Sequence, residues 1–138
     1  MSTPLRGECR CGRVRYLVAG DVKTVVNCHC NMCRTMNGAA FSTYAVVAES
    51  ELSVSGSAFL GHYTVLDTAT RHFCRHCGTP VFNTNPGRYP GAAMLYLGSL
   101  EGHEALRPGV SLYCESELAW AADPSGIPRR PRGPEQGG

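Results

Sequence analysis

The chain has 138 residues, which suits one domain with one modest core. It is 43% hydrophobic and 17% charged, a balance that predicts a folded protein and excludes a disordered one. A net charge of +2 is too small to indicate a nucleic-acid partner.

The N-terminal sequence has no apolar stretch of the secretory type, and no run approaches the roughly 20 apolar residues that a membrane-spanning helix needs. We therefore expect a soluble cytoplasmic protein without a membrane partner. Thiols stay reduced in that compartment, so the 8 cysteines are expected to be metal ligands rather than disulfides. A secreted disulfide framework is the alternative, and the knuckle-like cysteine spacings argue against it.

The first strand is predicted over 13–18, after residues 1–8, which have the character of a short arm. In this segment Val14, Tyr16 and Val18 fall on one face by strict alternation. The pattern is typical of a strand with one buried face.

A second strand is expected at 23–28, and the only helical turns at 31–38, ended by Gly38. The later segments are short, rich in β-branched and aromatic residues, and separated by Gly, Pro and Asn, so they are predicted to be strands. They are 41–47, 51–56, 58–66, 70–74, 80–84, 92–100 and 110–115. The sequence thus predicts a single all-β domain over 5–122, with roughly eight to ten short strands in two sheets.

The composition changes at Asp123, where the chain continues DPSGIPRRPRGPEQGG. This segment carries 4 Pro and no core-forming run after Ile127, so 123–138 is predicted to be a flexible C-terminal tail. Trp120, just before it, is expected to cap the core.

Seven of the eight cysteines fall in three clusters, and Cys114 stands apart in a β-type run, where we expect it to be buried. The clusters are Cys9 and Cys11; Cys28, Cys30 and Cys33; and Cys74 and Cys77. A Gly follows directly after Cys11 and Cys77, as metal knuckles favour, because Gly tolerates the positive φ of the turn.

Two knuckles with two thiolates each would make a closed zinc site, and three cysteines would remain for an open one. The spacing alone does not prove this grouping. Cys30 and Cys33 could instead pair with Cys74 and Cys77 as a zinc ribbon. An open zinc with three thiolates is a weak generator of hydroxide, so its ligand type favours thiol chemistry over water chemistry.

These motifs in series resemble the glutathione-dependent formaldehyde-activating enzyme family, which includes centromere protein V. C-x-C-G, C-H-C-x-x-C-R and F-C-x-x-C-G-T form a specific combination, although each alone would be weak. The matching segments are 7–16, 27–41, 73–82, 95–101 and 117–130.

The resemblance implies a zinc-containing, all-β, two-sheet β-tent and a carbon–sulfur lyase that joins glutathione and formaldehyde into S-hydroxymethylglutathione. It implies that the glutathione thiolate is captured on the zinc and then attacks the carbonyl carbon. By similarity, the structural zinc is held by Cys9, Cys11, Cys74 and Cys77, and the reactive-site zinc by Cys28, Cys30 and Cys33. A small thiol such as glutathione and a small aldehyde are the expected partners, and the sequence leaves a homodimer open.

Two residues beside the reactive cysteines are candidates for supporting roles. The ring of His29 is expected to point away from the metal side in a supporting role, with a fourth ligand and a proton shuttle as the alternatives. Arg34 either offsets thiolate charge, receives a substrate carboxylate or is simply solvated. The family often has a His where Ser111 stands and an Asp where Glu101 stands. His72 and His76 are expected at the surface.

Three classes of function remain open on the sequence. An enzyme needs an open three-thiolate zinc that accepts a thiol. A non-catalytic zinc module that binds a partner predicts a fourth protein ligand, or no metal, at Cys28, Cys30 and Cys33. A redox protein predicts that two of these three cysteines form a reversible disulfide.

Overall fold

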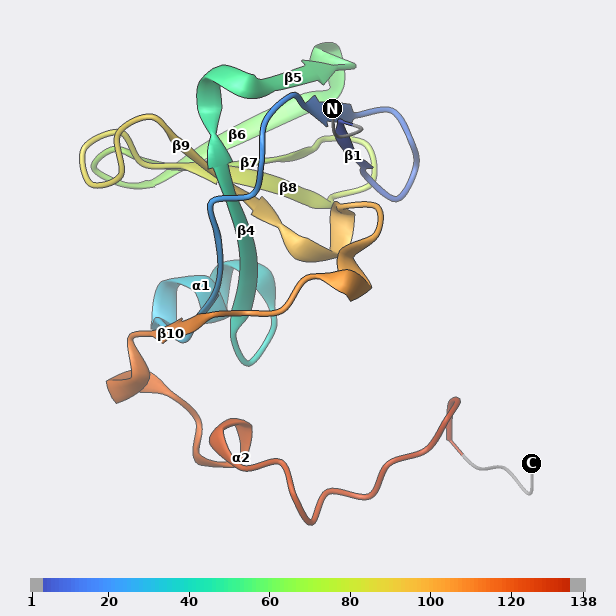
Figure 1. Ribbon diagram of the computed structural model, residues 1–138, viewed down its shortest axis with the longest axis vertical. Coiled ribbons are helices and arrows are strands. Elements are labelled where there is room, and N and C mark those ends of the chain that lie inside the picture. Colours follow the sequence, from blue (N-terminus) through green and yellow to red (C-terminus); the bar gives the residue numbers. More distant parts are fainter. Residues whose placement is uncertain (1–3, 135–138) are drawn as a thin grey trace.

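A computed structural model of the chain, in which residues 4–134 are described, consists of two β-sheets and two short helices (Figure 1). The all-β, two-sheet fold predicted from the sequence is confirmed. The helices are α1 (Asn31–Asn37) and α2 (Ala119–Ala122). The strands are β1 (Leu5–Glu8), β2 (Arg15–Val18), β3 (Thr24–Cys28), β4 (Ser42–Ala48), β5 (Leu52–Ser55), β6 (Leu60–Leu66), β7 (Ala69–Cys74), β8 (Pro80–Thr84), β9 (Ala92–Tyr96) and β10 (Val110–Leu112).

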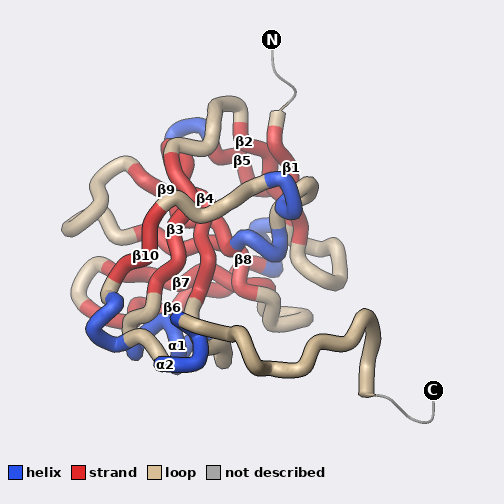
Figure 2. The backbone as a smooth tube through the Cα atoms, turned by 60° about the horizontal axis from the view of Figure 1, so that its bottom comes forward, coloured by secondary structure: helices blue, strands red, loops and turns tan. Residues whose placement is uncertain are grey.

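The larger sheet has seven strands in the order β10-β3-β4-β9-β8-β7-β6, and the smaller has three in the order β1-β2-β5 (Figure 2). Only β10 and β3 run parallel within the described sheets. The expected N-terminal arm is wrong for 5–8, which form β1 and pair with β2. A strand of four residues is too short to show an alternation of apolar and polar side chains, so the sequence does not predict β1.

Strand β4 divides the interior into two parts. Ala45 and Val47 are fully buried in the main core between the sheets, where they meet Tyr16 and Val18 of β2 and Val14 just before it. Tyr44, which directly precedes Ala45, points to the opposite face and joins a second apolar cluster with Val26, Cys28, Cys33 and Tyr96. Alternation along one strand therefore places the main core and the second cluster on opposite faces of the large sheet.

Helix α1 begins and ends where the sequence predicts a helical turn. Cys30 is its N-cap residue, and its sulfur accepts a hydrogen bond from the backbone N–H of Cys33 at 3.2 Å. Gly38 ends the helix in the left-handed region, with φ of 64°, where a residue without Cβ is favoured. The helix thus presents two cysteines from its first turn to the end of β3.

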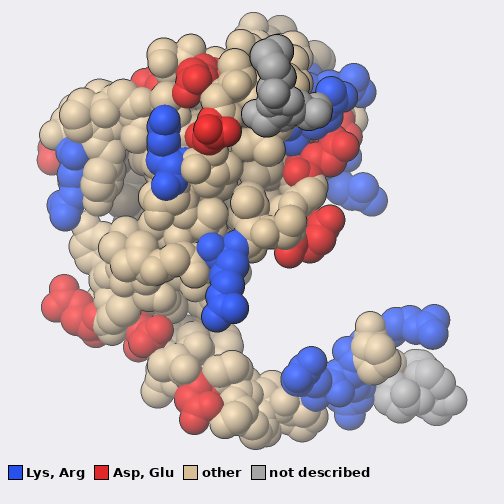
Figure 3. Space-filling model, in the orientation of Figure 1, with Lys and Arg blue, Asp and Glu red and all other residues tan. Residues whose placement is uncertain are grey.

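The C-terminal residues leave the body of the molecule as an extended arm (Figure 1). Residues 123–134 are exposed and contain no helix or strand, while 135–138 lie outside the described part, so flexibility of the tail stays a prediction. Trp120 does not cap the core: it is 55% exposed on α2, because the chain has already left the sheets there. Basic atoms gather near the end of the arm and are interspersed with acidic ones elsewhere on the face shown in Figure 3. No helix among residues 4–134 is long and apolar enough to cross a bilayer.

Candidate metal centres

The cysteines converge into two groups, and in each group the sulfur atoms all lie within 4.8 Å of one another. One group consists of Cys9, Cys11, Cys74 and Cys77, and the other of Cys28, Cys30 and Cys33. This is the grouping implied by the family resemblance rather than the alternative ribbon. Both groups could hold a metal ion; zinc itself stays a prediction.

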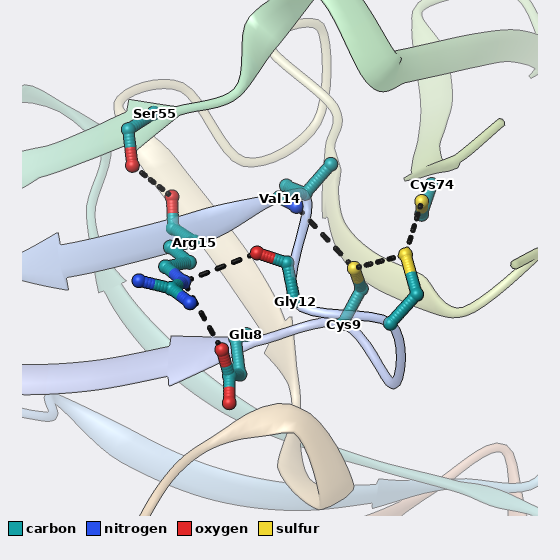
Figure 4. Close-up of polar contacts among 8 residues, drawn as sticks. Glu8, Cys9, Gly12, Val14, Arg15, Ser55 and Cys74 are labelled. Carbon is teal, nitrogen blue, oxygen red and sulfur yellow. Dashed lines mark hydrogen bonds and ion pairs between the residues drawn. The ribbon is translucent and has the colours of Figure 1, made fainter. Parts of the chain in front are cut away.

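The four-cysteine site is built from two glycine-ended turns, of which Figure 4 shows the first, with Cys9 and Gly12, facing Cys74 of the second. Gly12 and Gly78 both have φ of 81°, and their N–H groups bond back to the carbonyls of Cys9 and Cys74 at 3.1 and 2.8 Å. The chain reverses around each first cysteine, whose sulfur accepts a backbone N–H, that of Val14 for Cys9 at 3.3 Å. Each turn therefore supplies the hydrogen bonds that a thiolate ligand needs.

The sulfur spacing in this site suits a tetrahedral ion. Cys11 Sγ lies 3.6 Å from Cys9 Sγ and 3.7 Å from Cys74 Sγ. Zn–S bonds of about 2.3 Å at tetrahedral angles set sulfur atoms about 3.8 Å apart. The residues present therefore fit zinc with four thiolates.

Thr79 links the two turns and orders the exposed cysteine. Its Oγ1 accepts the N–H of Arg10 at 3.1 Å, and its own hydroxyl faces Cys77 Sγ at 3.2 Å. Hydrogen bonding from Thr79 lowers the pKa of the Cys77 thiol to about 5. The turn thus favours the thiolate form that a metal requires.

The three-cysteine site lies where β3 meets α1. Cys28 ends the strand, Cys30 caps the helix, and Cys33 stands in its first turn with Sγ 3.4 Å from Cys28 Sγ. The hydrogen bond from Cys33 lowers the pKa of Cys28 to about 6, while the same contact and burial raise the pKa of Cys33. No fourth His, Cys, Asp or Glu within residues 4–134 joins the group, so it matches the open type of site.

His29 does not join the three sulfurs as a fourth ligand, and its ring contacts other partners. It is only 2% exposed, its Nε2 lies 3.3 Å from Glu117 Oε2, and its ring packs on Phe41 at 4.9 Å. Its Nδ1 is the one buried side-chain nitrogen or oxygen of the described residues without a hydrogen-bond partner. The geometry assigns His29 to holding the segment after β10, and sequence reasoning did not identify its partner Glu117.

Arg34 is neither solvated nor free for a substrate. Its guanidinium donates to the carbonyls of His29, Ala40 and Ser116 at 3.3, 3.0 and 2.7 Å. It also donates to Asn31 Oδ1 at 2.9 Å. A planar group with several fixed donors suits this task, so Arg34 fastens the loop around the three cysteines.

The structure corrects the burial expected for Cys114 and His72 and places Ser111. Cys114 is exposed rather than buried, because Tyr113 adopts φ of 57° and turns the chain out of β10. His72 is half-buried and stacks on Phe82 at 4.2 Å, although His76 is exposed as expected. Ser111 is exposed and alternates away from Leu112, which packs beside Cys28, so the departure from the family at Ser111 leaves the cysteine site intact.

Comparisons with known proteins agree with the geometry. The profile of the glutathione-dependent formaldehyde-activating enzyme family matches residues 4–116. A Fusarium vanettenii protein provisionally given that enzyme's name is 28% identical over 127 residues, which cover 88% of this chain and 67% of the relative. A Schizosaccharomyces pombe protein named as an uncharacterised lyase is 28% identical over 76 residues, 55% of this chain and 54% of that protein.

Among solved structures, a Rhodobacter sphaeroides protein superposes with a TM-score of 0.62 at 24% sequence identity. The match covers 77% of this chain and 98% of the other. At this identity the likeness supports the fold alone.

Proposed function

Because this chain belongs to the glutathione-dependent formaldehyde-activating enzyme family, we propose that it is a carbon–sulfur lyase for a small thiol and a small aldehyde. Glutathione and formaldehyde are the first pair to expect. In the forward direction a bond forms between the thiol sulfur and the carbonyl carbon, the C=O π bond opens, and the oxygen takes a proton. The reverse direction breaks the same C–S bond.

One observation carries this proposal: three clustered thiols with no fourth ligand from the described chain. Cys28 and Cys33 are buried, while Cys30 is partly exposed, so we place the approach of an incoming molecule on the side of Cys30. A zinc ion bound by these thiolates would keep an incoming thiol in its reactive thiolate form. Arg34 and the His29–Glu117 pair hold the surrounding loop in place.

Arg88 is the cation best placed to receive a carboxylate of the thiol substrate. Its side chain is exposed, and its guanidinium carbon lies 5.6 and 5.8 Å from the ring centres of Tyr89 and Tyr113. Tyr113 directly follows Leu112, whose register partner is Cys28. No carboxylate of residues 4–134 makes an ion pair with Arg88, so this charge is available to a ligand.

We expect Arg88→Gln to raise the KM for glutathione about fivefold, the equivalent of about 1 kcal/mol for one charged hydrogen bond. The KM for uncharged 2-mercaptoethanol should stay unchanged, because that thiol has no carboxylate. Arg107→Gln, at the opposite end of β10, is the matched control. Equal effects on both thiols, or none on either, would contradict the assignment of Arg88.

The proposed function is tested by exchange kinetics, because thiols and formaldehyde combine in water without a catalyst. NMR exchange spectroscopy gives the rate at which glutathione passes between its free and hydroxymethyl forms, with and without zinc-loaded protein. We expect a protein-dependent rate that S-methylglutathione cannot support. A protein with two metal ions per chain that leaves the exchange rate of every thiol–aldehyde pair at its buffer value would refute the proposal.

A thiol-redox role is the second candidate, and the 3.4 Å between Cys28 Sγ and Cys33 Sγ favours it. In that case Cys28 and Cys33 would lose two electrons and two protons to a disulfide such as oxidised glutathione. Mass spectrometry after treatment with oxidised glutathione separates the two functions. A rapid, reversible loss of two hydrogens supports the redox role, and a stable metal-bound dithiol contradicts it.

A further inference from the structure

Tyr44 connects the three-cysteine site to polar side chains of α1 and of neighbouring strands in the large sheet. It lies on β4, is 5% exposed, and its Oη is 3.2 Å from Cys33 Sγ. By distance alone, either atom could donate the hydrogen in this contact. The partners behind Tyr44 decide which one does.

Asn83 of β8 presents its amide nitrogen to Tyr44. Its Oδ1 accepts the hydroxyl of Tyr96 at 2.9 Å, which leaves Nδ2 facing Tyr44 Oη at 3.3 Å. An amide NH2 group can only donate, so Tyr44 is the acceptor in this bond.

Asn37, the last residue of α1, also presents its amide nitrogen to Tyr44. Its Oδ1 accepts from Arg71 Nε at 3.4 Å, and its Nδ2 lies 3.5 Å from Tyr44 Oη and 2.6 Å from Ser42 Oγ. Two amide donors therefore converge on one phenol oxygen. Its single hydrogen is left to point at Cys33 Sγ.

We propose that Tyr44 is a positioning residue that donates a hydrogen bond to the Cys33 thiolate, and that Tyr96 and Arg71 orient it through the amides of Asn83 and Asn37. The inference rests on the metal site of the proposed function but not on its substrates.

The direction of these bonds has a chemical consequence. Three thiolates would leave a bound divalent ion with a net charge of −1, which weakens its attraction for a further ligand. A charge-assisted hydrogen bond withdraws electron density from one of the thiolates. Tyr44 would thus offset part of the excess negative charge at the open side of the site.

The test replaces zinc with cobalt(II) and compares Tyr44→Phe with the wild type. Without its hydrogen bond, Cys33 becomes a stronger electron donor, so we expect the sulfur-to-cobalt charge-transfer band of the three-cysteine site to move to longer wavelength. Tyr96→Phe, two hydrogen bonds further away through Asn83, should give a smaller shift of the same sign. Tyr16→Phe is the matched control: Tyr16 is 2% exposed and bonds to Ser99 Oγ at 2.9 Å in the main core, away from this site.

An unshifted band in a folded Tyr44→Phe protein with two cobalt ions would overturn the proposal and leave Tyr44 a packing residue. If Tyr44→Phe does not fold, Tyr96→Phe decides the same question, since an unshifted band there also overturns it. The spectrum requires neither thiol nor aldehyde. A shifted band in a protein that does not speed exchange would therefore sustain the role of Tyr44 while refuting the proposed function.

Discussion

Changing Cys30 to Ser should remove one of two zinc ions per chain and abolish thiol–aldehyde exchange while the protein stays folded. The thiolate is lost, yet a serine oxygen can still accept the N–H of Cys33 at the start of α1, as the sulfur of Cys30 does at 3.2 Å. The four-cysteine site and the main core lie elsewhere, so we expect the four-cysteine site to keep its zinc. The zinc content under reducing conditions and the exchange rate measure the two effects.

Cys30→Ala sharpens this experiment, because it removes the helix cap together with the ligand. It should lose the same zinc ion and, in addition, about 1 kcal/mol of stability relative to Cys30→Ser. Thermal unfolding of the two variants gives this difference. One zinc ion in both the wild type and the variants would show that the three cysteines hold no metal and would exclude the proposed open site.

Cys74→Ser is expected to have the largest effect on stability. Cys74 is fully buried, belongs to the main core and lies in the four-cysteine group. Structural zinc contributes about 10–16 kcal/mol in small zinc domains at neutral pH, which equals or exceeds the total stability of about 5–15 kcal/mol of most domains. We therefore expect the variant to be unfolded, and strong chelators to unfold the wild type.

Cys114→Ser is the control for this variant, because Cys114 is exposed and outside both groups. It should keep two zinc ions and the wild-type melting temperature. Circular dichroism during titration with a chelator follows the loss of structure. A metal-free protein with a native spectrum and a cooperative melt would contradict the structural role of the four-cysteine site.

Much of the fold was predictable because its signals are local. The alternation of Val14, Tyr16 and Val18 predicted which side of β2 is buried, and all three are at most 2% exposed. Gly12 and Gly78 marked the two cysteine turns, since a positive φ is a property of the residue itself. The grouping of the cysteines came from the family resemblance, because spacing could not choose between pairings distant in the chain.

The predictions that were wrong concern residues whose burial depends on tertiary packing rather than on the local sequence. Cys114 follows a strand-like run, but the left-handed backbone of Tyr113 ends that strand and exposes the thiol. Trp120 is a large apolar residue of the kind expected in a core, yet its side chain is exposed because neither sheet covers α2. The hydrogen-bond network around Tyr44 joins residues from five different elements, and no spacing along the chain predicts it.

The two faces of β4 have a consequence for how such a protein diverges. The four-cysteine group adjoins the main core, whereas Cys28 and Cys33 belong to the cluster on the opposite face of the sheet. We therefore expect that Cys28, Cys30 and Cys33 can be lost by mutation in a relative while the fold is retained. Relatives of this fold that lack the proposed activity should be recognisable by an intact four-cysteine group and a three-cysteine group in which one or more cysteines are replaced.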